Sequence, residues 1–412
     1  MDHGVSMKFE KDRVIIVGAG PVGMVCALGL NRAGIKVTVL ELEPAPVEDQ
    51  RAASLHPPTV EMLDRLGIAG DIIPLGLVSS KYHFRDRVSG ELIAEFDLSS
   101  LKDEVPFPYV LQYEQYKLTH DISQKFADES DFDVRFSRRV TDIRILDDRV
   151  EVEAQGPAGK ETFVAGWLVG ADGGRSTVRH AADIEFEGFT YPERFIKIAT
   201  AFDFQKYRPE YVYRNYLSDP DEWCNLFKVA GKRDPGLWRT ILPTRVDETE
   251  EQALHPDAVE ARLQKFFPKP GRYEIEYVNV YSVSQRVAAT FRKGRALLVG
   301  DSAHVNNPIG GMGMNGGIHD AINLCEKLPA VIRGELNDSV LDLYSRQRRK
   351  VASDYVQAQT IRNKKMMEER DPASRRRNFD ELRKIAENPA TAKAYMRNAA
   401  LIESLRAAAA VQ

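Results

Sequence analysis

The chain has 412 residues, 43% of them hydrophobic, with 28 glycines and 21 prolines. This length is enough for two or three domains, and the composition excludes disordered, collagen-like and coiled-coil chains. Lysine and arginine number 57 against 61 aspartates and glutamates, which gives a net charge of −4. The charge balance offers no global reason to bind nucleic acid or an acidic membrane, so an anionic partner must be held by local geometry.

The cysteines and the N-terminus indicate the compartment. The three cysteines, Cys26, Cys224 and Cys325, lie too far apart for a CxxC pair and are too few for a secreted disulfide framework. The N-terminus is polar and lacks the apolar core of a signal peptide, and no run of about 18 apolar residues occurs. We therefore expect a cytoplasmic protein without a membrane span.

The first predicted elements form a βαβ unit. Apolar runs at 14–17 and 36–40 predict two buried strands. Between them lie Gly18-Ala19-Gly20-Pro21-Val22-Gly23 and an amphipathic helix, and Glu41 follows the second strand. This is the dinucleotide-binding fingerprint, in which the glycines permit a tight turn, close approach of a pyrophosphate, and packing of helix on strand. Glu41 would accept hydrogen bonds from a ribose diol.

The pattern of predicted elements changes along the chain. Before residue 186 we expect helices and strands in alternation, at 57–66 (helix), Val78–Arg87 and Glu91–Phe96 (hairpin), 113–127 (helix), 132–154 (paired strands) and 167–170 (buried strand). From 186 to 284 short alternating strands predict a largely antiparallel sheet, at 211–216, 223–229, 237–242 and 273–281. A buried strand at 295–299 and long helices over 314–330 and 338–370 follow.

Two further motifs each place an aspartate at the end of a buried strand. Asp172 lies in Ala171-Asp172-Gly173-Gly174-Arg175, and Asp301 lies in Gly300-Asp301-Ser302-Ala303-His304. Open α/β sheets bind ligands at this edge. A glycine-rich stretch at 308–315 then enters a helix, whose first N–H groups are unpaired and carry the positive end of the helix dipole.

These three motifs, in this order, resemble those of the single-component FAD-dependent aromatic hydroxylases, the para-hydroxybenzoate hydroxylase family, over about residues 10–365. The resemblance implies an α/β fold: a Rossmann-like FAD-binding domain similar to that of glutathione reductase, an inserted, mostly antiparallel substrate sheet, and C-terminal helices. The implied boundaries are 8–78, 104–185 and 285–365 for the FAD-binding domain, 79–103 and 186–284 for the substrate sheet, and 366–412 for a helical tail.

The resemblance also implies which residues hold FAD. Gly18, Gly20 and Gly23 would bind the pyrophosphate together with Pro21 and Val22. Glu41 would bind the ribose and Arg51 the phosphates, and Gln112, Val140 and Asp301 would make further contacts with FAD. Gly313, Met314 and Asn315 would offer backbone N–H groups to the flavin pyrimidine edge, where charge collects on reduction. Pro308 belongs to the loop beside flavin and substrate. The neighbouring Asn307 departs from the family, where a Pro-Pro pair is common.

Asp172 has two open interpretations. The resemblance implies that Asp172-Gly173 serves both FAD and the transient NADH or NADPH, because the family has no separate domain for the nicotinamide cofactor. The carboxylate could instead satisfy N–H groups of its own loop together with Arg175 or Arg179. The sequence leaves both interpretations open.

The implied reaction is the flavin's. In this family NAD(P)H reduces FAD, O₂ adds to give a C4a-hydroperoxide, and its distal oxygen attacks an electron-rich ring, so we expect hydroxylation of a small phenolic or heteroaromatic compound. No metal is required. In the substrate sheet, alternation places Trp223 and Phe227 on one face and Cys224 and Leu226 on the other.

Residues for the substrate are hypotheses from the composition of that sheet. Tyr213 or Tyr216 would meet the substrate hydroxyl, and Arg214 or Arg239 would pair with a substrate carboxylate. No catalytic residue is assigned, because His304 and His56 can each be structural. The alternatives are an FAD-dependent reductase or oxidase without oxygen transfer, and a flavin-free binding protein. A homodimer is implied by the resemblance alone.

Overall fold

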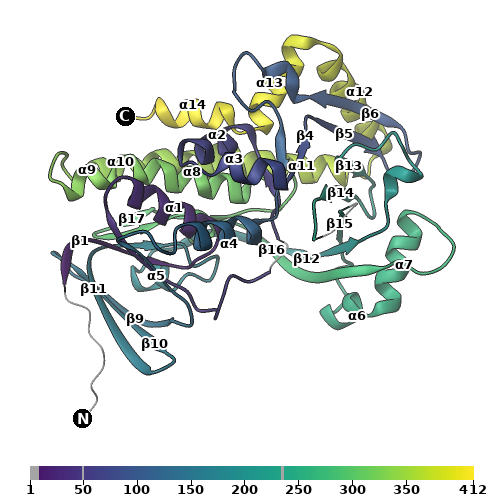
Figure 1. Cartoon of the computed structure of the whole chain (residues 1–412). Helices are drawn as coiled ribbons and strands as arrows, with labels where there is room; N and C mark the ends of the chain where they lie inside the picture. The colour runs from purple at the N-terminus through teal and green to yellow at the C-terminus, as the bar shows by residue number, and fades with distance from the viewer. Residues whose placement is uncertain (1–8, 49–50, 233–235) are drawn as a thin grey trace.

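The computed structural model describes residues 9–48, 51–232 and 236–412 (Figure 1). Most of the polar N-terminus, in which the first predicted domain begins, and Gln50 beside Arg51 lie outside these ranges. Within them, we find no helix whose length and hydrophobicity would suit a bilayer crossing. The same residues contain no group of three or more His, Cys, Asp or Glu side chains placed to hold a metal ion.

The first sheet has the order β17–β18–β11–β1–β2–β8, in which all neighbours are parallel except β17 and β18, which are antiparallel. Its strands are β1 (Glu10–Val17), β2 (Lys36–Leu40), β8 (Phe132–Arg135), β11 (Gly159–Gly170), β17 (Arg292–Lys293) and β18 (Ala296–Leu298). Two antiparallel strands, β9 (Arg139–Ile145) and β10 (Val150–Gly156), extend it from β11. The end of β1 is buried completely, as a parallel strand covered on both faces must be, which explains its continuous apolar run.

Helices cover this sheet and connect its strands. Helix α1 (Pro21–Arg32) packs along α8 (Gly313–Cys325), and α10 (Val340–Val351) lies beside them on the same side of the sheet (Figure 1). The remaining helices of this half are α2 (Pro57–Arg65), α3 (Ala69–Ile72), α4 (Gln115–Lys125), α5 (Thr177–Ala181), α9 (Leu328–Ile332) and the short turn η4 (Gly300–Ser302). One continuous hydrophobic core joins these elements.

The second sheet has the order β19–β16–β12–β15–β14–β13–β5–β6. Its strands are β5 (Lys81–Asp86), β6 (Leu92–Asp97), β12 (Phe186–Thr200), β13 (Arg214–Ser218), β14 (Cys224–Val229), β15 (Leu237–Pro243), β16 (Ile275–Ala288) and β19 (His304–Val305). Neighbours are antiparallel except β13 and β5, which are parallel. The expected α/β fold with a mostly antiparallel second sheet is therefore present.

Helices bury both faces of the second sheet. Helices α6 (Glu250–Leu254) and α7 (Pro256–Phe266) cover one face, where Cys224 and Leu226 are buried. The other face carries Trp223 and Phe227 and lies against the C-terminal helices. The predicted period-two alternation of this strand is confirmed, and it separates a purely structural core from the face that leads to the site.

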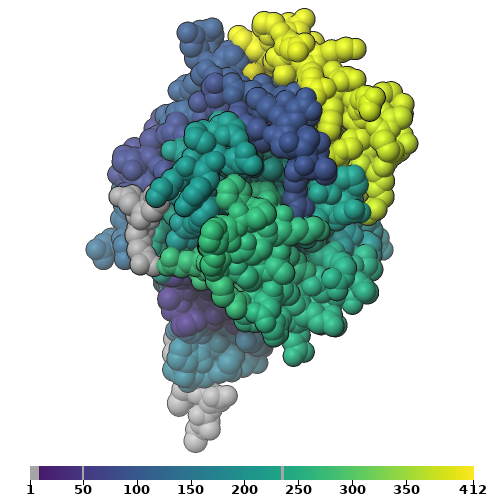
Figure 2. Space-filling view, turned by 90° about the vertical axis from the view of Figure 1, so that its right-hand side faces the viewer, coloured from purple at the N-terminus to yellow at the C-terminus, as the bar shows by residue number. Residues whose placement is uncertain are grey.

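The C-terminal segment is a wall of the second sheet. After α10 come a π-helical turn (Ala352–Gln357), α11 (Ala358–Met367), α12 (Pro372–Glu387), α13 (Pro389–Ala399) and α14 (Ile402–Ala409). Figure 2 shows these helices in yellow against the blue segment that holds β5 and β6. Arg375 of α12 pairs with Asp86 of β5 at 2.6 Å, which helps to hold the pKa of that carboxyl below its usual value against the effect of burial.

Several details differ from the sequence-based expectations. Val78 belongs not to the hairpin but to β4 (Leu77–Ser79), which pairs with β7 (Val110–Gln112) in a small sheet completed by β3 (Ser54–Leu55). Strand β8 pairs with β2 rather than with β9. Tyr211 and Tyr213 precede β13, because a turn bonds the Tyr211 N–H to the Arg208 carbonyl. Alternation alone does not show which partner a strand takes.

Candidate active site

The fingerprint turn is closed by contacts that only glycine permits. Gly18 has a φ of +102°, and a Cβ there would lie 2.4 Å from the carbonyl oxygen of Ala171. A Cβ on Gly23 would lie 2.0 Å from the carbonyl oxygen of Gly18. A Cβ on Gly20, the N-cap of α1, would meet nothing within 4 Å. The turn is therefore packed on itself but leaves open space over a helix N-terminus, where an anion is favoured.

Glu41 lies directly after β2, next to this turn. One carboxylate oxygen accepts a hydrogen bond from the Ala19 N–H at 2.6 Å, and the other accepts from the Glu43 N–H at 2.9 Å. These bonds fix the orientation of the carboxylate. Each oxygen keeps a lone pair, so the group can still accept hydrogen bonds from a diol.

A cleft of about 1400 Å³ extends from the fingerprint turn to the second sheet. All three sequence motifs contribute to its lining. The predicted FAD contacts that line it are Gly18, Gly20, Pro21, Val22, Glu41, Arg51, Gln112, Val140, Asp172, Asp301, Pro308, Gly313 and Met314. Gly23 and Asn315 are buried and do not line it. The motifs, which are separated by more than 100 residues, thus meet around one space.

Asp172 both lines the cleft and anchors its own loop. Its carboxylate accepts hydrogen bonds from the Ser176 hydroxyl and, at 3.1 Å, from the Val178 N–H. Burial raises the pKa of the carboxyl above its ordinary value. Arg179 donates instead to the carbonyls of Ser302 and Gly174. The structural interpretation of Asp172 is therefore visible, in a position that also faces the cleft.

Asp301 lies in η4, just after β18, and is exposed to the cleft. The surrounding protein excludes water from the carboxyl and so raises its pKa, although the charges of Arg51 and His304 act in the opposite direction. The turn that carries Asp301 is held from behind, since the Gly300 N–H donates to Asp320 Oδ2 at 3.1 Å. Asp301 is thus presented on a fixed turn.

Asp320 of α8 is a buried centre of this support that the sequence analysis missed. Its Oδ2 also contacts His304 Nε2 at 2.8 Å, and its Oδ1 accepts from Arg348 of α10 at 2.6 Å. Burial would raise the pKa of this carboxyl, but His304 and Arg348 hold it below its ordinary value. His304 therefore has a structural partner. The available signal was that Asp320 is the only acidic residue between Gly313 and Cys325, in a predicted helix of mostly apolar residues.

Helix α8 begins at the glycine-rich turn. The first hydrogen bond of its first turn joins the Gly316 N–H to the Met312 carbonyl, so the N–H groups of residues 313–315 precede the helical ladder. The Asn315 side chain accepts from the His56 N–H at 2.8 Å and donates to the carbonyls of Ser54 and Gly311 at 2.8 and 2.6 Å. This amide clamps the segment before α2 onto the start of α8.

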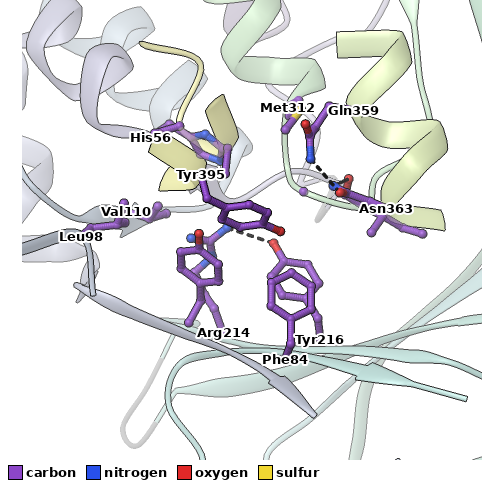
Figure 3. A pocket seen from close by; sticks show the side chains of 15 residues that line it. His56, Phe84, Leu98, Val110, Arg214, Tyr216, Met312, Gln359, Asn363 and Tyr395 are labelled. Carbon is purple, nitrogen blue, oxygen red and sulfur yellow. Dashed lines mark hydrogen bonds between the residues drawn. The ribbon is translucent and has the colours of Figure 1, made fainter. Parts of the chain in front are cut away.

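A small pocket of about 30 Å³ adjoins the cleft (Figure 3). Met312 lines both spaces. The aromatic residues of the pocket are Tyr82, Phe84, Tyr216 and Tyr395, and its polar residues are His56, Arg214, Gln359 and Asn363. Arg214 donates to the Tyr216 hydroxyl at 3.0 Å, as the dashed line in Figure 3 shows. Phe84 and Tyr216 stack with ring centroids 5.1 Å apart.

The predicted substrate residues are divided among different places. Arg214 and Tyr216 line the small pocket. Arg239 and Pro308 line the cleft, and Arg239 donates to the Arg51 carbonyl at 2.9 Å. Tyr213 lines neither space, and Lys228 lies over its ring at 5.6 Å. The structure thus places two of the five residues in the small pocket, two in the cleft and one in neither space.

Comparisons with known proteins agree with this arrangement. Residues 11–359 match the family described as FAD binding domain. The chain belongs to this family of FAD-dependent aromatic hydroxylases. It is 37% identical over 371 residues to a para-nitrophenol 4-monooxygenase of Pseudomonas sp. (strain WBC-3), covering 88% of this chain and 89% of that protein.

Two further relatives cover most of the hydroxylase. A 6-hydroxy-3-succinoylpyridine 3-monooxygenase, HspB, of Pseudomonas putida (strain DSM 28022 / S16) is 34% identical over 348 residues, or 82% of this chain and 85% of that protein. The crystal structure of the p-nitrophenol 4-monooxygenase PnpA from Pseudomonas putida DLL-E4 superposes with a TM-score of 0.90, at 34% identity, over 97% of this chain and 99% of that one. The hydroxylase is thus an FAD-dependent monooxygenase of small aromatic compounds, with NADH or NADPH as reductant.

The cleft of the hydroxylase fits FAD chemically. Gln112 Oε1 accepts from the Ser54 hydroxyl at 2.6 Å, whereas its buried amide Nε2 has no partner among the described residues. A buried donor without a partner is costly unless a ligand satisfies it. The empty space over Gly20 suits a pyrophosphate, and the N–H groups of Gly313 and Met314, which line the cleft, suit an electron-rich edge.

Several pocket residues of the hydroxylase gave little signal in the sequence. Tyr395 comes from α13, within a segment interpreted as a tail. Gln359 and Asn363 come from α11 and share one face of it by their spacing of four. His56 carries no assigned role in the sequence analysis, because a histidine at this position can be structural. These residues are brought together by tertiary contacts between distant segments, which no local motif records.

Proposed function

We propose that this hydroxylase oxygenates a single-ring phenol that carries a hydrogen-bond-accepting substituent, with the ring bound in the small pocket. One observation carries the proposal: an aromatic-lined pocket adjoins the FAD cleft and contains a buried guanidinium, that of Arg214. Of the pocket's described lining residues, Arg214 is the only lysine or arginine. A nitro, carboxylate or carbonyl group would be held by its N–H donors.

The size of the pocket supports one ring rather than several. Its volume of about 30 Å³ is well below the roughly 150 Å³ of a cavity that holds benzene, so even one ring requires side chains to move. Tyr395 stacks on Phe96 with centroids 4.5 Å apart and lies among the pocket side chains in Figure 3. A fused polycyclic substrate would require a much larger rearrangement.

The names of the relatives support a position for oxygenation. Position 4 of para-nitrophenol and position 3 of 6-hydroxy-3-succinoylpyridine are both para to the ring hydroxyl, and both already carry a substituent. We extend this pattern to the present chain. The flavin cleft would then receive the substituted carbon, and a good leaving group would be released on oxygenation.

We propose that FAD binds along the cleft as the motifs indicate, with its diphosphate at Gly18–Gly23 and its reactive ring near Pro308 and the start of α8. Bound reduced FAD supplies the activation of O₂. The protein excludes water, orients the ring and presents N–H donors from residues 313–315. We also propose that the chain works as a homodimer in the cytoplasm, which size-exclusion chromatography with light scattering and cell fractionation would test.

The decisive experiment uses 4-nitrophenol with the purified, FAD-loaded enzyme. We expect NAD(P)H oxidation, O₂ uptake and release of nitrite, because oxygenation at the nitro-bearing carbon expels that group as nitrite and leaves a quinone. Arg214→Met should raise the Kd of 4-nitrophenol by roughly 10–100-fold, since a hydrogen bond from a charged group contributes about 1.5–3 kcal/mol. Arg239→Met, in the cleft wall, is the matched control and should change that Kd little. Oxidation of NAD(P)H that yields H₂O₂ alone would contradict the proposal.

A further inference from the structure

His56 is the most unusual polar residue of the small pocket. It is the N-cap of α2 and only 2% exposed. Its backbone is fixed on both sides: its N–H donates to Asn315 Oδ1 at 2.8 Å, and its carbonyl accepts from the Val60 N–H at 3.0 Å. Neither nitrogen of its ring has a hydrogen-bond partner among the described residues. The ring is thus held rigidly in the pocket lining with unsatisfied polar atoms.

The surroundings keep this imidazole neutral. Burial lowers the pKa of His56 well below its ordinary value, and Arg214 and His319 lower it further. The backbone carbonyl of Gly310 acts in the opposite sense, although no hydrogen bond of acceptable geometry joins it to the ring. A neutral imidazole has one N–H donor and one acceptor nitrogen. His56 is therefore a hydrogen-bond acceptor throughout the neutral pH range.

The His56 imidazole, an acceptor, shares the pocket with Arg214, whose charged group offers only hydrogen-bond donors. Arg214 can only donate, and its Nε is also buried without a partner among the described residues. Leaving both groups unsatisfied is costly, by about 1–3 kcal/mol for each neutral group. A ligand that donates at one point and accepts at another would satisfy both. A phenol with a polar substituent has this pattern.

We propose that His56 accepts a hydrogen bond from the ring hydroxyl of the phenolic substrate; this assignment rests on the proposed function. Arg214 then holds the substituent, so the two residues together orient the ring. The other ionisable groups around this contact are the hydroxyls of Tyr82, Tyr216 and Tyr395, together with His319 behind His56. Burial raises the pKa of Tyr82 and Tyr395, so both remain neutral alongside the imidazole.

The same contact gives the hydroxyl proton a destination. When the ring is oxygenated, the O–H bond of the substrate breaks, its electron pair remains with the substrate oxygen as a carbonyl forms, and the proton passes to the imidazole nitrogen. The imidazolium loses the proton to solvent as the product leaves. A base within hydrogen-bond reach of the proton that it removes is the geometric requirement for this step.

The test compares two ligands that differ only in the hydroxyl, 4-nitrophenol and nitrobenzene. Their Kd values are measured with FAD-loaded enzyme in the absence of NAD(P)H, so no turnover is needed. In the wild type we expect 4-nitrophenol to bind at least about tenfold more tightly, the value of one hydrogen bond of about 1.4 kcal/mol. His56→Leu should abolish this preference and leave the nitrobenzene Kd within about twofold. His56→Gln, which keeps an acceptor, should restore part of it.

Each other outcome is decisive. Equal weakening of both ligands in His56→Leu would show a merely structural role, and an unchanged preference would show that another group meets the hydroxyl; either overturns the proposal. Binding of neither ligand by the wild type would overturn both this proposal and the proposed substrate class. A wild type that prefers 4-nitrophenol through His56 but releases no nitrite would overturn the proposed reaction alone.

The absorbance of bound 4-nitrophenol gives an independent measurement, because phenol and phenolate absorb at different wavelengths. At a pH one unit above the pKa of the free phenol, where most of the free ligand is phenolate, we expect bound neutral phenol in the wild type and bound phenolate in His56→Leu. A neutral imidazole that accepts a hydrogen bond from the hydroxyl favours the protonated phenol, and this preference is lost with the imidazole. Phenolate bound by the wild type at this pH would place the oxygen on Arg214 and overturn the assignment.

Discussion

The FAD cleft and the substrate pocket are built in opposite ways. Within the cleft, of about 1400 Å³, the part formed by the three motifs is shaped by backbone: a glycine turn, two strand ends and a helix start. The pocket, of about 30 Å³, is shaped by aromatic, aliphatic and polar side chains from segments spread between His56 and Ala400. A backbone-shaped site must keep its glycines to bind the same cofactor. A site shaped by side chains can change its ligand one residue at a time.

The largest expected effect comes from the glycine turn. Alanine at either of two glycines should be harmful, but one substitution should lower stability and the other FAD affinity. Gly23→Ala places a Cβ 2.0 Å from the Gly18 carbonyl oxygen, so we expect the apoprotein to lose at least about 3 kcal/mol of unfolding free energy. Gly20→Ala has open space and a φ of −65°, so the apoprotein should keep its stability. The FAD Kd of Gly20→Ala should nevertheless rise, because the added methyl group occupies the space proposed for the pyrophosphate.

Urea unfolding of the apoproteins and FAD titration separate the two variants. Equal stability of Gly23→Ala and the wild type would contradict the packed turn. Unchanged FAD affinity in Gly20→Ala would show that the pyrophosphate does not bind at the helix N-terminus.

The next effect tests whether the cleft depends on buried charge behind it. Asp320→Asn leaves Arg348 without its carboxylate partner, and removing one member of a buried pair costs about 3–5 kcal/mol of unfolding free energy. FAD affinity should fall as well, since Asp320 supports the turn that carries Asp301. Glu326→Gln, an exposed acid at the end of the same helix, is the control and should change stability by less than about 0.5 kcal/mol.

A smaller effect is expected at the pocket wall. Tyr395→Ala should widen the pocket and raise the ratio of kcat/KM for a two-ring phenol over a one-ring phenol by about tenfold, the usual effect of freeing space in an apolar pocket. Tyr395→Phe keeps the ring that stacks on Phe96 and should leave the ratio unchanged. FAD affinity should be the same in both variants, because Tyr395 does not line the cleft. An unaltered ratio in Tyr395→Ala would show that another element sets the size limit.

The smallest effect concerns pH. Burial lowers the pKa of His319 to about 3, against 6.5 for an unperturbed histidine. The unfolded chain therefore takes up a proton before the folded chain does as the pH falls. This contribution to the unfolding free energy is complete above pH 6.5 and decreases below it, by up to about 1.4 kcal/mol per pH unit. His319→Gln should reduce this slope by up to about 1.4 kcal/mol per pH unit, the contribution of one proton, in urea unfolding between pH 7 and 5. A wild-type stability that does not change over this range would contradict the buried, neutral state.

The contrast between cleft and pocket explains what could be predicted from the sequence. The family, the α/β fold and the cofactor followed from motifs in which nearby residues must satisfy local backbone geometry, such as Gly18 with Gly23. The roles of the individual FAD residues remain predictions. Arg214 and Tyr216 were named because they share a strand, but the same reasoning named Tyr213, which lies outside the pocket. Tyr395 and Asp320 could not be placed, since their partners are brought to them by tertiary packing.

The position of α13 has a consequence for the order in which the protein is assembled. During synthesis the chain emerges from its N-terminus, and α8 completes the FAD cleft while Tyr395 is still to be translated. The face of the second sheet that carries Tyr82 and Phe84 then remains uncovered until the last helices are translated. A nascent chain can therefore have a finished cofactor site before it has any substrate selectivity.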